Sequence, residues 1–162
     1  MNDDIIVRRA APADLPVLGR LGALLMRAHH DFDPCRFMAP AEHAQRGYAG
    51  FLGEQLEQDT AAIFVAERGG TVLGYVYAAI EGKAWKELRD VAGFIHDVAV
   101  VESERGQGLG ARLLDVAAQW LAGQGVPRIM LWTAEQNAGA QQLFAKLGFR
   151  RTMIEMTREV AR

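Results

Sequence analysis

Hydrophobic and polar positions repeat along this chain with two periods, one typical of strands and the other typical of helices. Ile5 to Arg9, which opens with three β-branched apolar residues, predicts a short strand. Leucines from Leu15 to Leu25 then recur on one helical face, behind a Pro12 and an Asp14 that suit a first helical turn. The pattern breaks from His29 to Pro40, a segment with two prolines, and we expect irregular structure there.

The middle of the chain predicts a second helix, over Ala41 to Glu57, followed by strands. Ile63 to Glu67 and Val72 to Ile80 are rich in β-forming residues and are separated by a Gly-Gly turn, so they predict a hairpin. Glu81 to Ala92 carries many charges and leads into a further strand, Phe94 to Val101.

The second half of the chain alternates between strand and helix patterns. A glycine-rich turn, Arg105 to Gly110, opens a helix that ends near Gly123. Arg128 to Thr133 follows as a nearly continuous apolar run, which indicates a strand covered on both faces. Because a helix joins it to the preceding strand, we predict a parallel pair with a right-handed crossover. Asn137 to Phe149 then predicts a last helix, and Arg151 to Arg158 a strand that closes the sheet.

The composition fits a single domain over residues 1–162. Half of the residues are hydrophobic, enough for a substantial core. The net charge of −2 argues against a nucleic-acid partner, because such partners usually require a strongly basic face. A single cysteine, Cys35, forbids an internal disulfide, and the sequence has no signal-peptide region or membrane-spanning apolar run. We therefore expect a cytoplasmic protein that does not bind membranes.

The glycine-rich turn predicts an anion site. Without Cβ atoms its backbone can bend sharply and direct N–H groups at a phosphate, and the following helix adds its positive end. A P-loop is excluded because Gly110 is followed by Ala111 and Arg112 rather than by Lys and Ser or Thr. A dinucleotide-binding turn would require an acidic residue about 20 positions further on, where the chain has Arg128 to Leu131.

The glycine-rich turn and the last predicted helix resemble two signatures of the GNAT-type N-acetyltransferases. Arg105, Gly108 and Gly110 match the acyl-coenzyme A signature Gln/Arg-x-x-Gly-x-Gly/Ala. Asn137 to Phe149 resembles the second signature, N-x-x-A-x-x-L-Y/F-x-x-x-G-F. The resemblance covers nearly the whole chain in order. It implies an α/β fold with a mixed, mostly antiparallel central sheet, helices on both faces, and a parallel pair, strands four and five, splayed to admit acyl-CoA.

The same resemblance implies acetyl-CoA as cosubstrate, and no metal. The pantetheine arm would lie between the splayed strands and bind the backbone of Val98, Ala99 and Val100, with Asn137 contacting the arm near the fifth strand. Phe144 occupies the position at which many relatives carry a tyrosine as general acid, and phenylalanine has no proton to give. The pyrophosphate would bind the glycine turn, which consists of Arg105, Gly106, Gln107, Gly108, Leu109 and Gly110.

Acetyl transfer to an amine requires a base, because a free amine is almost wholly protonated at neutral pH. His96 is the natural candidate, since histidine changes its charge between pH 5 and 8, and Asp97 is the reserve. The strand period predicts that these two side chains point to opposite faces. By resemblance, the backbone N–H of Val98 would donate to the oxyanion of the intermediate.

The sequence does not identify the acceptor, which we expect to be a small-molecule amine, such as an amino acid or an antibiotic, or a peptide N-terminus. Asp31 and Asp33 could attract a cationic amine, with Phe32 or Phe37 covering its apolar part. A zinc site among the His, Asp and Cys residues of this segment is disfavoured, because their spacing fits no established set. Trp85 is either a core residue or part of the substrate wall. A CoA-binding sensor without turnover is the alternative function, and relatives in this family are often homodimers.

Overall fold

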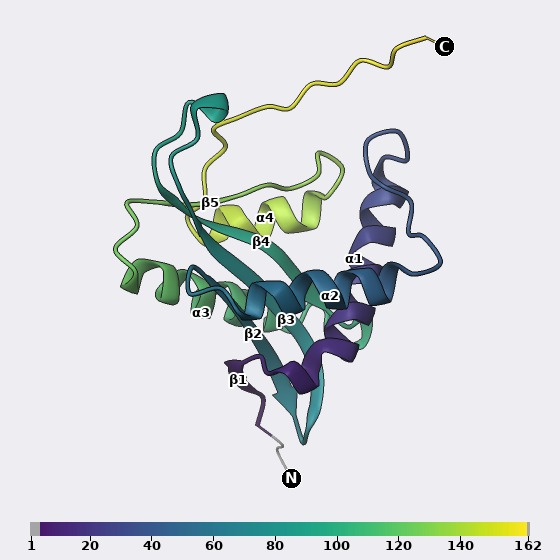
Figure 1. The fold of residues 1–162 in the computed structure, drawn as a ribbon, viewed down its shortest axis with the longest axis vertical. Helices are drawn as coiled ribbons and strands as arrows, with labels where there is room; N and C mark the ends of the chain where they lie inside the picture. The colour runs from purple at the N-terminus through teal and green to yellow at the C-terminus, as the bar shows by residue number, and fades with distance from the viewer. Residues whose placement is uncertain (1–3, 162) are drawn as a thin grey trace.

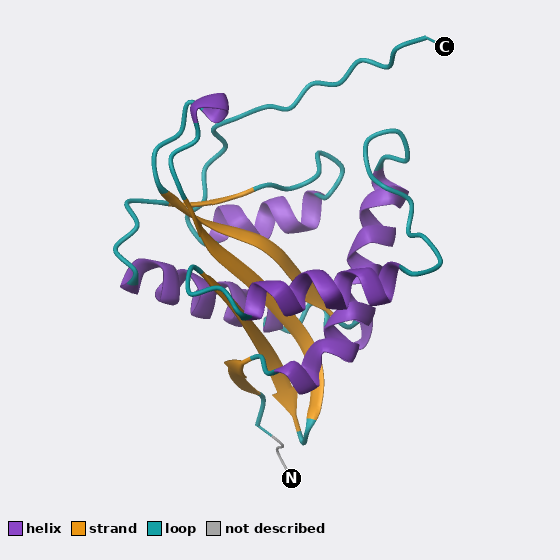
Figure 2. Cartoon of the chain, viewed as in Figure 1, coloured by secondary structure: helices purple, strands orange, loops and turns teal. Residues whose placement is uncertain are grey.

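A five-stranded sheet, in the order β1-β2-β3-β4-β5, organises the computed structural model, which describes residues 4–161 (Figures 1 and 2). Helices α1 and α2 lie on one face, and α3 and α4 on the other. The elements are β1 (Ile6–Arg9), α1 (Leu15–Phe32), α2 (Ala44–Leu56), β2 (Ala61–Arg68), β3 (Thr71–Glu81), β4 (Ala92–Val100), α3 (Leu109–Gly123), β5 (Ile129–Leu131) and α4 (Ala138–Lys146).

The strand directions confirm the mixed sheet that the sequence predicts. β1 to β4 pair antiparallel in sequence order, and β5 alone is parallel to its neighbour β4. The β4–β5 ladder holds only three residue pairs and ends where Ile95 meets Leu131. β4 continues to Val100, so its last five residues have no β5 strand beside them. The parallel pair therefore separates at His96.

Two apolar clusters, one on each face of the sheet, form the core. Leucines of α1 and α2 pack on the face that carries Ile63, Val65 and Tyr75, and leucines of α3 pack on the opposite face. The predicted hairpin is also confirmed, because β2 and β3 meet at Gly69 and Gly70, which have φ values of 55° and 81°. L-residues rarely adopt such values, which explains the two glycines.

Two predictions about the ends of elements are wrong. Helix α1 continues to Phe32, so His29 and His30 are helical, and the Asp33 N–H still donates to the His29 carbonyl at 3.1 Å. The predicted closing strand, Arg151 to Arg158, is absent: these residues are extended but pair with no strand among the described residues. None of the described helices combines the length and the apolar character needed to cross a membrane.

Candidate active site

A β-bulge in β4 determines the geometry of the candidate site. Tyr77 of β3 pairs with Asp97, whereas the next residue, Ala78, pairs with Ile95. His96 is therefore an extra residue on β4 with no direct partner on β3. The extra residue shifts the alternation of side chains, so that His96 and Asp97 both face the α1–α2 side. The prediction that they point to opposite faces is wrong for this reason.

Asp97 accepts two tyrosine hydroxyl groups. The Tyr48 hydroxyl, from α2, donates to Oδ2 at 2.6 Å, and the Tyr75 hydroxyl, from β3, donates to the same oxygen at 3.0 Å. Burial raises the pKa of Asp97 above its usual range, and the two hydroxyls, which favour the charged form, offset only part of this effect. Among the described residues, no side chain donates to Oδ1. That oxygen is available to a cationic ligand.

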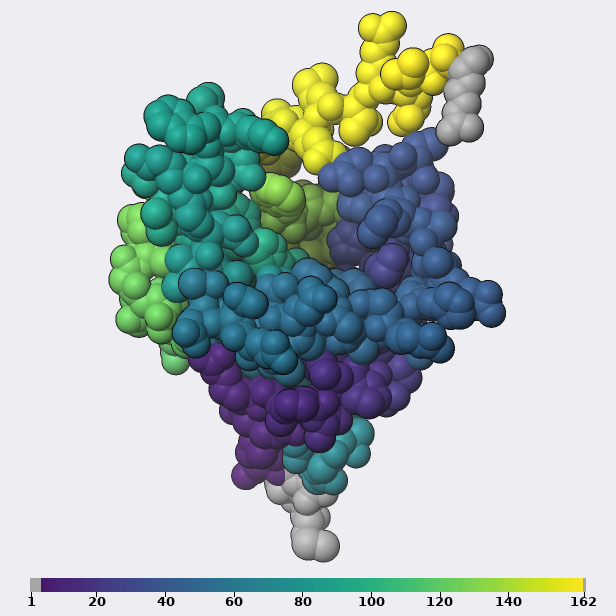
Figure 3. Space-filling view, in the orientation of Figure 1, coloured from purple at the N-terminus to yellow at the C-terminus, as the bar shows by residue number. Residues whose placement is uncertain are grey.

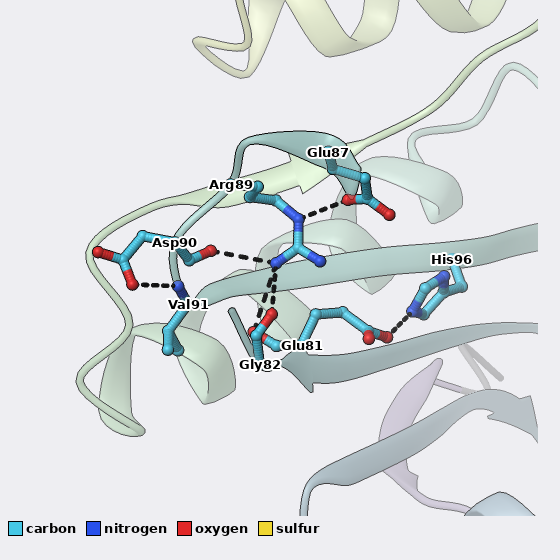
Figure 4. A network of polar contacts seen from close by, with 7 residues as sticks. All are labelled: Glu81, Gly82, Glu87, Arg89, Asp90, Val91 and His96. Atoms are coloured by element: carbon cyan, nitrogen blue, oxygen red, sulfur yellow. Dashed lines mark hydrogen bonds and ion pairs between the residues drawn. The ribbon is translucent and has the colours of Figure 1, made fainter. Parts of the chain in front are cut away.

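His96 is bonded to a carboxylate that sequence reasoning missed. Its Nε2 lies 2.9 Å from Oε1 of Glu81, the last residue of β3 (Figure 4). Because an ionised carboxylate only accepts hydrogen bonds, Nε2 carries the proton in this pair, and in the neutral ring Nδ1 keeps its lone pair. The histidine ring is stacked on Tyr77 at 5.0 Å and on Phe94 at 5.5 Å between centroids. These contacts fix both the tautomer and the plane of the ring.

Arg89, in the turn before β4, packs its guanidinium against the Phe94 ring, on which His96 is stacked. Its guanidinium lies 5.0 Å from the centroid of the Phe94 ring. Figure 4 shows the same guanidinium donating to the carbonyl groups of Gly82 at 3.0 Å and Asp90 at 3.1 Å. Its Nε donates to Glu87 at 2.7 Å. The arginine thus ties the connection between β3 and β4 to the aromatic rings that orient His96.

His96 and Asp97 line a cavity of about 240 Å³ beneath the end of α1. Phe37 lines it, as predicted for the substrate wall, whereas Asp31 and Asp33 do not. Asp33 instead accepts the backbone N–H groups of two residues in the turn that follows α1. The described residues around the cavity are Leu25, Met26, His29, Phe37, Met38, Tyr48, His96 and Asp97.

Two other features lie apart from this cavity. Trp85 is 84% exposed, which excludes a place in the core, and it does not line the cavity either. A larger hollow of about 610 Å³ lies between α1 and the start of α2, but it contains none of the predicted site residues. Of these two cavities, the 240 Å³ one is lined by the candidate base.

The glycine turn has the backbone shape expected of an anion site. Gly106 and Gly108 have φ values of 74° and 83°, which L-residues rarely adopt, and a Cβ on either would point into open space. Gly108 is the N-cap of α3, so no side chain caps the first N–H groups of that helix. Arg105 fixes the turn to the end of β4, because its Nε donates to the Val100 carbonyl at 3.1 Å.

The remaining predicted residues have structural contacts of their own. Leu109 is buried, and Gly110 lies within α3 against Leu143. Gln107 donates to the Ser103 carbonyl at 3.0 Å. The Oδ1 of Asn137 caps α4 by accepting the Ala140 N–H at 3.2 Å, which leaves its amide nitrogen for another partner.

Phe144 and the end of β4 complete the set. Phe144 is 8% exposed and packs edge-on against Phe149, so it belongs to the core of the α3–α4 face. Val98, Ala99 and Val100 are half-buried in the part of β4 that has separated from β5.

The model of the acetyltransferase (GNAT) family matches residues 25–149. The chain belongs to this family. The match confirms the family that the glycine turn and the second signature predict. Over 98 residues the chain is 33% identical to a mycothiol acetyltransferase of Thermobispora bispora, covering 60% of this chain and 33% of that protein. It is 29% identical over 126 residues to an uncharacterized N-acetyltransferase of Methanocaldococcus jannaschii, covering 78% of this chain and 53% of that protein.

The chain spans about a third of the length of the mycothiol acetyltransferases it matches. Solved structures agree in fold over nearly all of both chains. An aminoglycoside N-acetyltransferase in complex with CoA superposes with a TM-score of 0.76 at 19% identity, covering 99% of this chain and 97% of that one. A transcriptional regulator from Bacillus halodurans superposes with a TM-score of 0.76 at 19% identity, covering 97% of this chain and 100% of that one. Likeness at this level of identity describes the fold and not the activity.

Proposed function

We propose that the GNAT domain transfers the acetyl group of acetyl-CoA to the primary amine of a small molecule. The observation that carries this proposal is the cavity beside the point where β4 and β5 separate, because it holds both a histidine and a carboxylate. The names of two relatives, a mycothiol acetyltransferase and an aminoglycoside N-acetyltransferase, point to small molecules as acetyl acceptors.

The residues at the end of β4 fit acetyl-CoA, which supplies the activated thioester. On its β5 side, β4 has no strand partner from His96 to Val100 among the described residues. The backbone groups on that side could bind a pantetheine arm. The turn at Gly106 and Gly108 presents backbone N–H groups without a covering side chain, next to the positive end of α3. A pyrophosphate suits such a site.

His96 would act as the base, accepting the amine proton at Nδ1. Glu81 holds the proton on Nε2 and stabilises the imidazolium that results, so it is a positioning residue. Asp97 would bind the ammonium form of the acceptor through Oδ1 before the proton is removed. As the amine nitrogen bonds to the acyl carbon, the backbone N–H of Val98 would donate to the oxyanion, and the C–S bond then breaks.

The thiolate would leave without a proton from the protein at position 144. Phe144 is buried and has no acidic hydrogen. A thiol has a pKa of about 8.5, so its anion is a stable leaving group near neutral pH. Loss of the tyrosine that relatives use is therefore compatible with turnover.

The cavity favours a monoamine with a compact apolar body. Of the eight described residues around it, Asp97 is the one carboxylate, and five are Leu, Met, Phe or Tyr. A polycationic acceptor would leave its other charges without partners in this wall, which costs free energy. The volume of about 240 Å³ lies below the range of about 300–1,000 Å³ for drug-sized ligands, so the acceptor should be small.

Thiol release from acetyl-CoA tests the proposal with three acceptors: phenethylamine, an aminoglycoside such as kanamycin, and a peptide with a free N-terminus. We expect the kcat/KM for phenethylamine to exceed the other two by about tenfold or more, a difference of about 1.4 kcal/mol. His96→Ala should lower kcat/KM by about 10²- to 10⁴-fold. His43→Ala, a histidine beside the larger hollow, is the matched control and should change little.

Two outcomes would contradict the proposal. If His96→Ala and wild type have the same kcat/KM, His96 is not the base. Tight binding of acetyl-CoA without thiol release under any of the amines would instead indicate a CoA-binding sensor.

A further inference from the structure

His29, near the end of α1, is a second histidine in the wall of the 240 Å³ cavity. His96 and Asp97 line the same cavity from β4. Figure 3 shows the surface hollowed between these two parts of the chain, with the end of α1 and the loop after it on one side and the strands on the other. Proton transfer to His96 does not involve His29, so another reason is needed for an imidazole in a mostly apolar wall.

The two ring nitrogens of His29 have different surroundings. Nδ1 lies 2.9 Å from the carbonyl oxygen of Leu25, one turn earlier in α1. Because a carbonyl only accepts hydrogen bonds, Nδ1 carries the proton, and Nε2 of the neutral ring keeps its lone pair. The rings of Phe32 and Phe37 contact the imidazole edge-on, with 5.9 Å and 5.0 Å between centroids. These contacts fix the plane of the ring as well as its tautomer.

Nε2 of His29 and Oδ1 of Asp97 are both open to solvent. Neither atom has a hydrogen-bond partner among residues 4–161. Within that part of the chain, no buried side-chain nitrogen or oxygen lacks a partner, so these two atoms must be accessible. Since both side chains line the cavity, a ligand in the cavity meets a free lone pair on each of them.

Electrostatics link His29 to Asp97 and distinguish it from His96. Burial is the largest influence on the pKa of Asp97 and raises it, whereas a charge on His29 is among the weaker influences that lower it. The proton of His29 is held by a neutral carbonyl, and that of His96 by the carboxylate of Glu81. A carboxylate stabilises an imidazolium more than a carbonyl does. The amine proton therefore goes to His96, and His29 stays a neutral hydrogen-bond acceptor.

A primary ammonium group has three N–H donors, and the cavity offers three free lone pairs, on Oδ1 of Asp97, Nδ1 of His96 and Nε2 of His29. We infer that His29 accepts the third N–H of the substrate ammonium and thereby makes the enzyme selective for primary amines. An N-methyl group would replace one N–H and leave Nε2 of His29 without a donor. This inference rests on the proposed function, because it takes the cavity to be the site of the amine.

Glutamine and asparagine separate the roles of the two ring nitrogens. In His29→Gln the side-chain amide reaches about as far as Nε2 does, so its oxygen can still accept the third N–H. In His29→Asn the shorter amide lies near the former Nδ1, and the ammonium lacks one partner. Both variants lose the imidazole ring and its contacts with the two phenylalanines, so a purely structural role would affect them alike. Urea midpoints show whether both variants fold.

Calorimetry in the presence of CoA measures the affinity of each protein for phenethylamine and for N-methylphenethylamine. Wild type and His29→Gln should bind phenethylamine at least about tenfold more tightly, a difference of about 1.4 kcal/mol. In His29→Asn the ratio should fall to about threefold or less, because phenethylamine loses a hydrogen bond that the methylated amine never makes. His43→Asn, beside the larger hollow, is the matched control and should keep the wild-type ratio.

The kinetics of phenethylamine acetylation provide a second readout. Because the hydrogen bond to His29 already exists in the bound ammonium, His29→Asn should raise KM and change kcat little. His96→Ala, in contrast, removes the base and should lower kcat.

Three results would overturn the inference: a wild type that binds both amines equally or binds neither, a wild-type ratio in His29→Asn, or a loss of selectivity in His29→Gln as complete as in His29→Asn. The proposed function fails by a different result, which is selective binding of phenethylamine without thiol release from acetyl-CoA. Thiol release with unchanged selectivity in His29→Asn contradicts the inference alone.

Discussion

Tyr75→Phe tests the description of Asp97 as a buried carboxylate held by two hydroxyl groups. Tyr75 is fully buried, and its hydroxyl donates to Oδ2 of Asp97 at 3.0 Å. Phenylalanine fills the same space, so the variant loses the hydrogen bond and little packing. A hydrogen bond to a charged group contributes about 1.5–3 kcal/mol. We expect the free energy of unfolding to fall by this amount wherever Asp97 is ionised.

Tyr77→Phe is the matched control on the same strand. The Tyr77 hydroxyl donates to the neutral amide oxygen of Gln55 at 3.0 Å, a bond of about 0.5–1.5 kcal/mol. Burial raises the pKa of Tyr77 to about 12, so its hydroxyl stays protonated over the range of the experiment. The loss in Tyr77→Phe should therefore be smaller and independent of pH.

The pH dependence has a definite sign. The folded-state pKa of Asp97 is raised, so ionisation of Asp97 costs stability as pH rises above its unfolded value of about 3.8. Because the tyrosine hydroxyls favour the charged form, removing one raises the folded-state pKa further. The destabilisation by Tyr75→Phe should thus be greater at about pH 8 than at about pH 5 in urea titrations. A loss that is equal at both pH values, or no greater than that of Tyr77→Phe, would refute the reasoning.

Two further pairs of variants separate structural from ligand-binding roles. Gly108→Ala forces a Cβ into the left-handed region and should cost about 1–2 kcal/mol, whereas Gly110→Ala, within α3, should gain up to about 1 kcal/mol; equal urea midpoints would contradict this. Asn137→Ala should lose about 1 kcal/mol with the cap of α4. Asn137→Asp keeps the cap but loses the amide donor, so it should weaken acetyl-CoA binding by calorimetry without unfolding; unchanged affinity would remove Asn137 from the cofactor site.

Features that depend on neighbouring residues could be predicted from the sequence. The hairpin follows from two adjacent glycines, and the strand-turn-helix unit follows from Gly106 and Gly108, whose positive φ values explain the glycines. The wrong boundary of α1 has an equally local cause. Polar residues at His29 and His30 interrupt the apolar stripe without interrupting the backbone hydrogen bonds, so composition alone suggested an end that the helix does not have.

Features that depend on distant partners could not be predicted. Glu81 is 15 positions from His96, and Tyr48 is 49 positions from Asp97, so no motif joins either pair. Acidic side chains attract amines, so the sequence makes Asp31 and Asp33 candidates for binding the acceptor. The structure instead places Asp97 at the cavity and uses Asp33 to hold a turn.

The bulge at His96 connects these observations. His96 is the first residue after the β4–β5 ladder ends, and it is also the extra residue in the β3–β4 register. Because the alternation of side chains shifts at that position, the histidine and the aspartate face one cavity. Because β5 ends its pairing there, the β5-side edge of β4 beyond His96 has no strand partner among the described residues. The bulge and the end of the ladder therefore coincide at His96, where two ionisable side chains come to the same face.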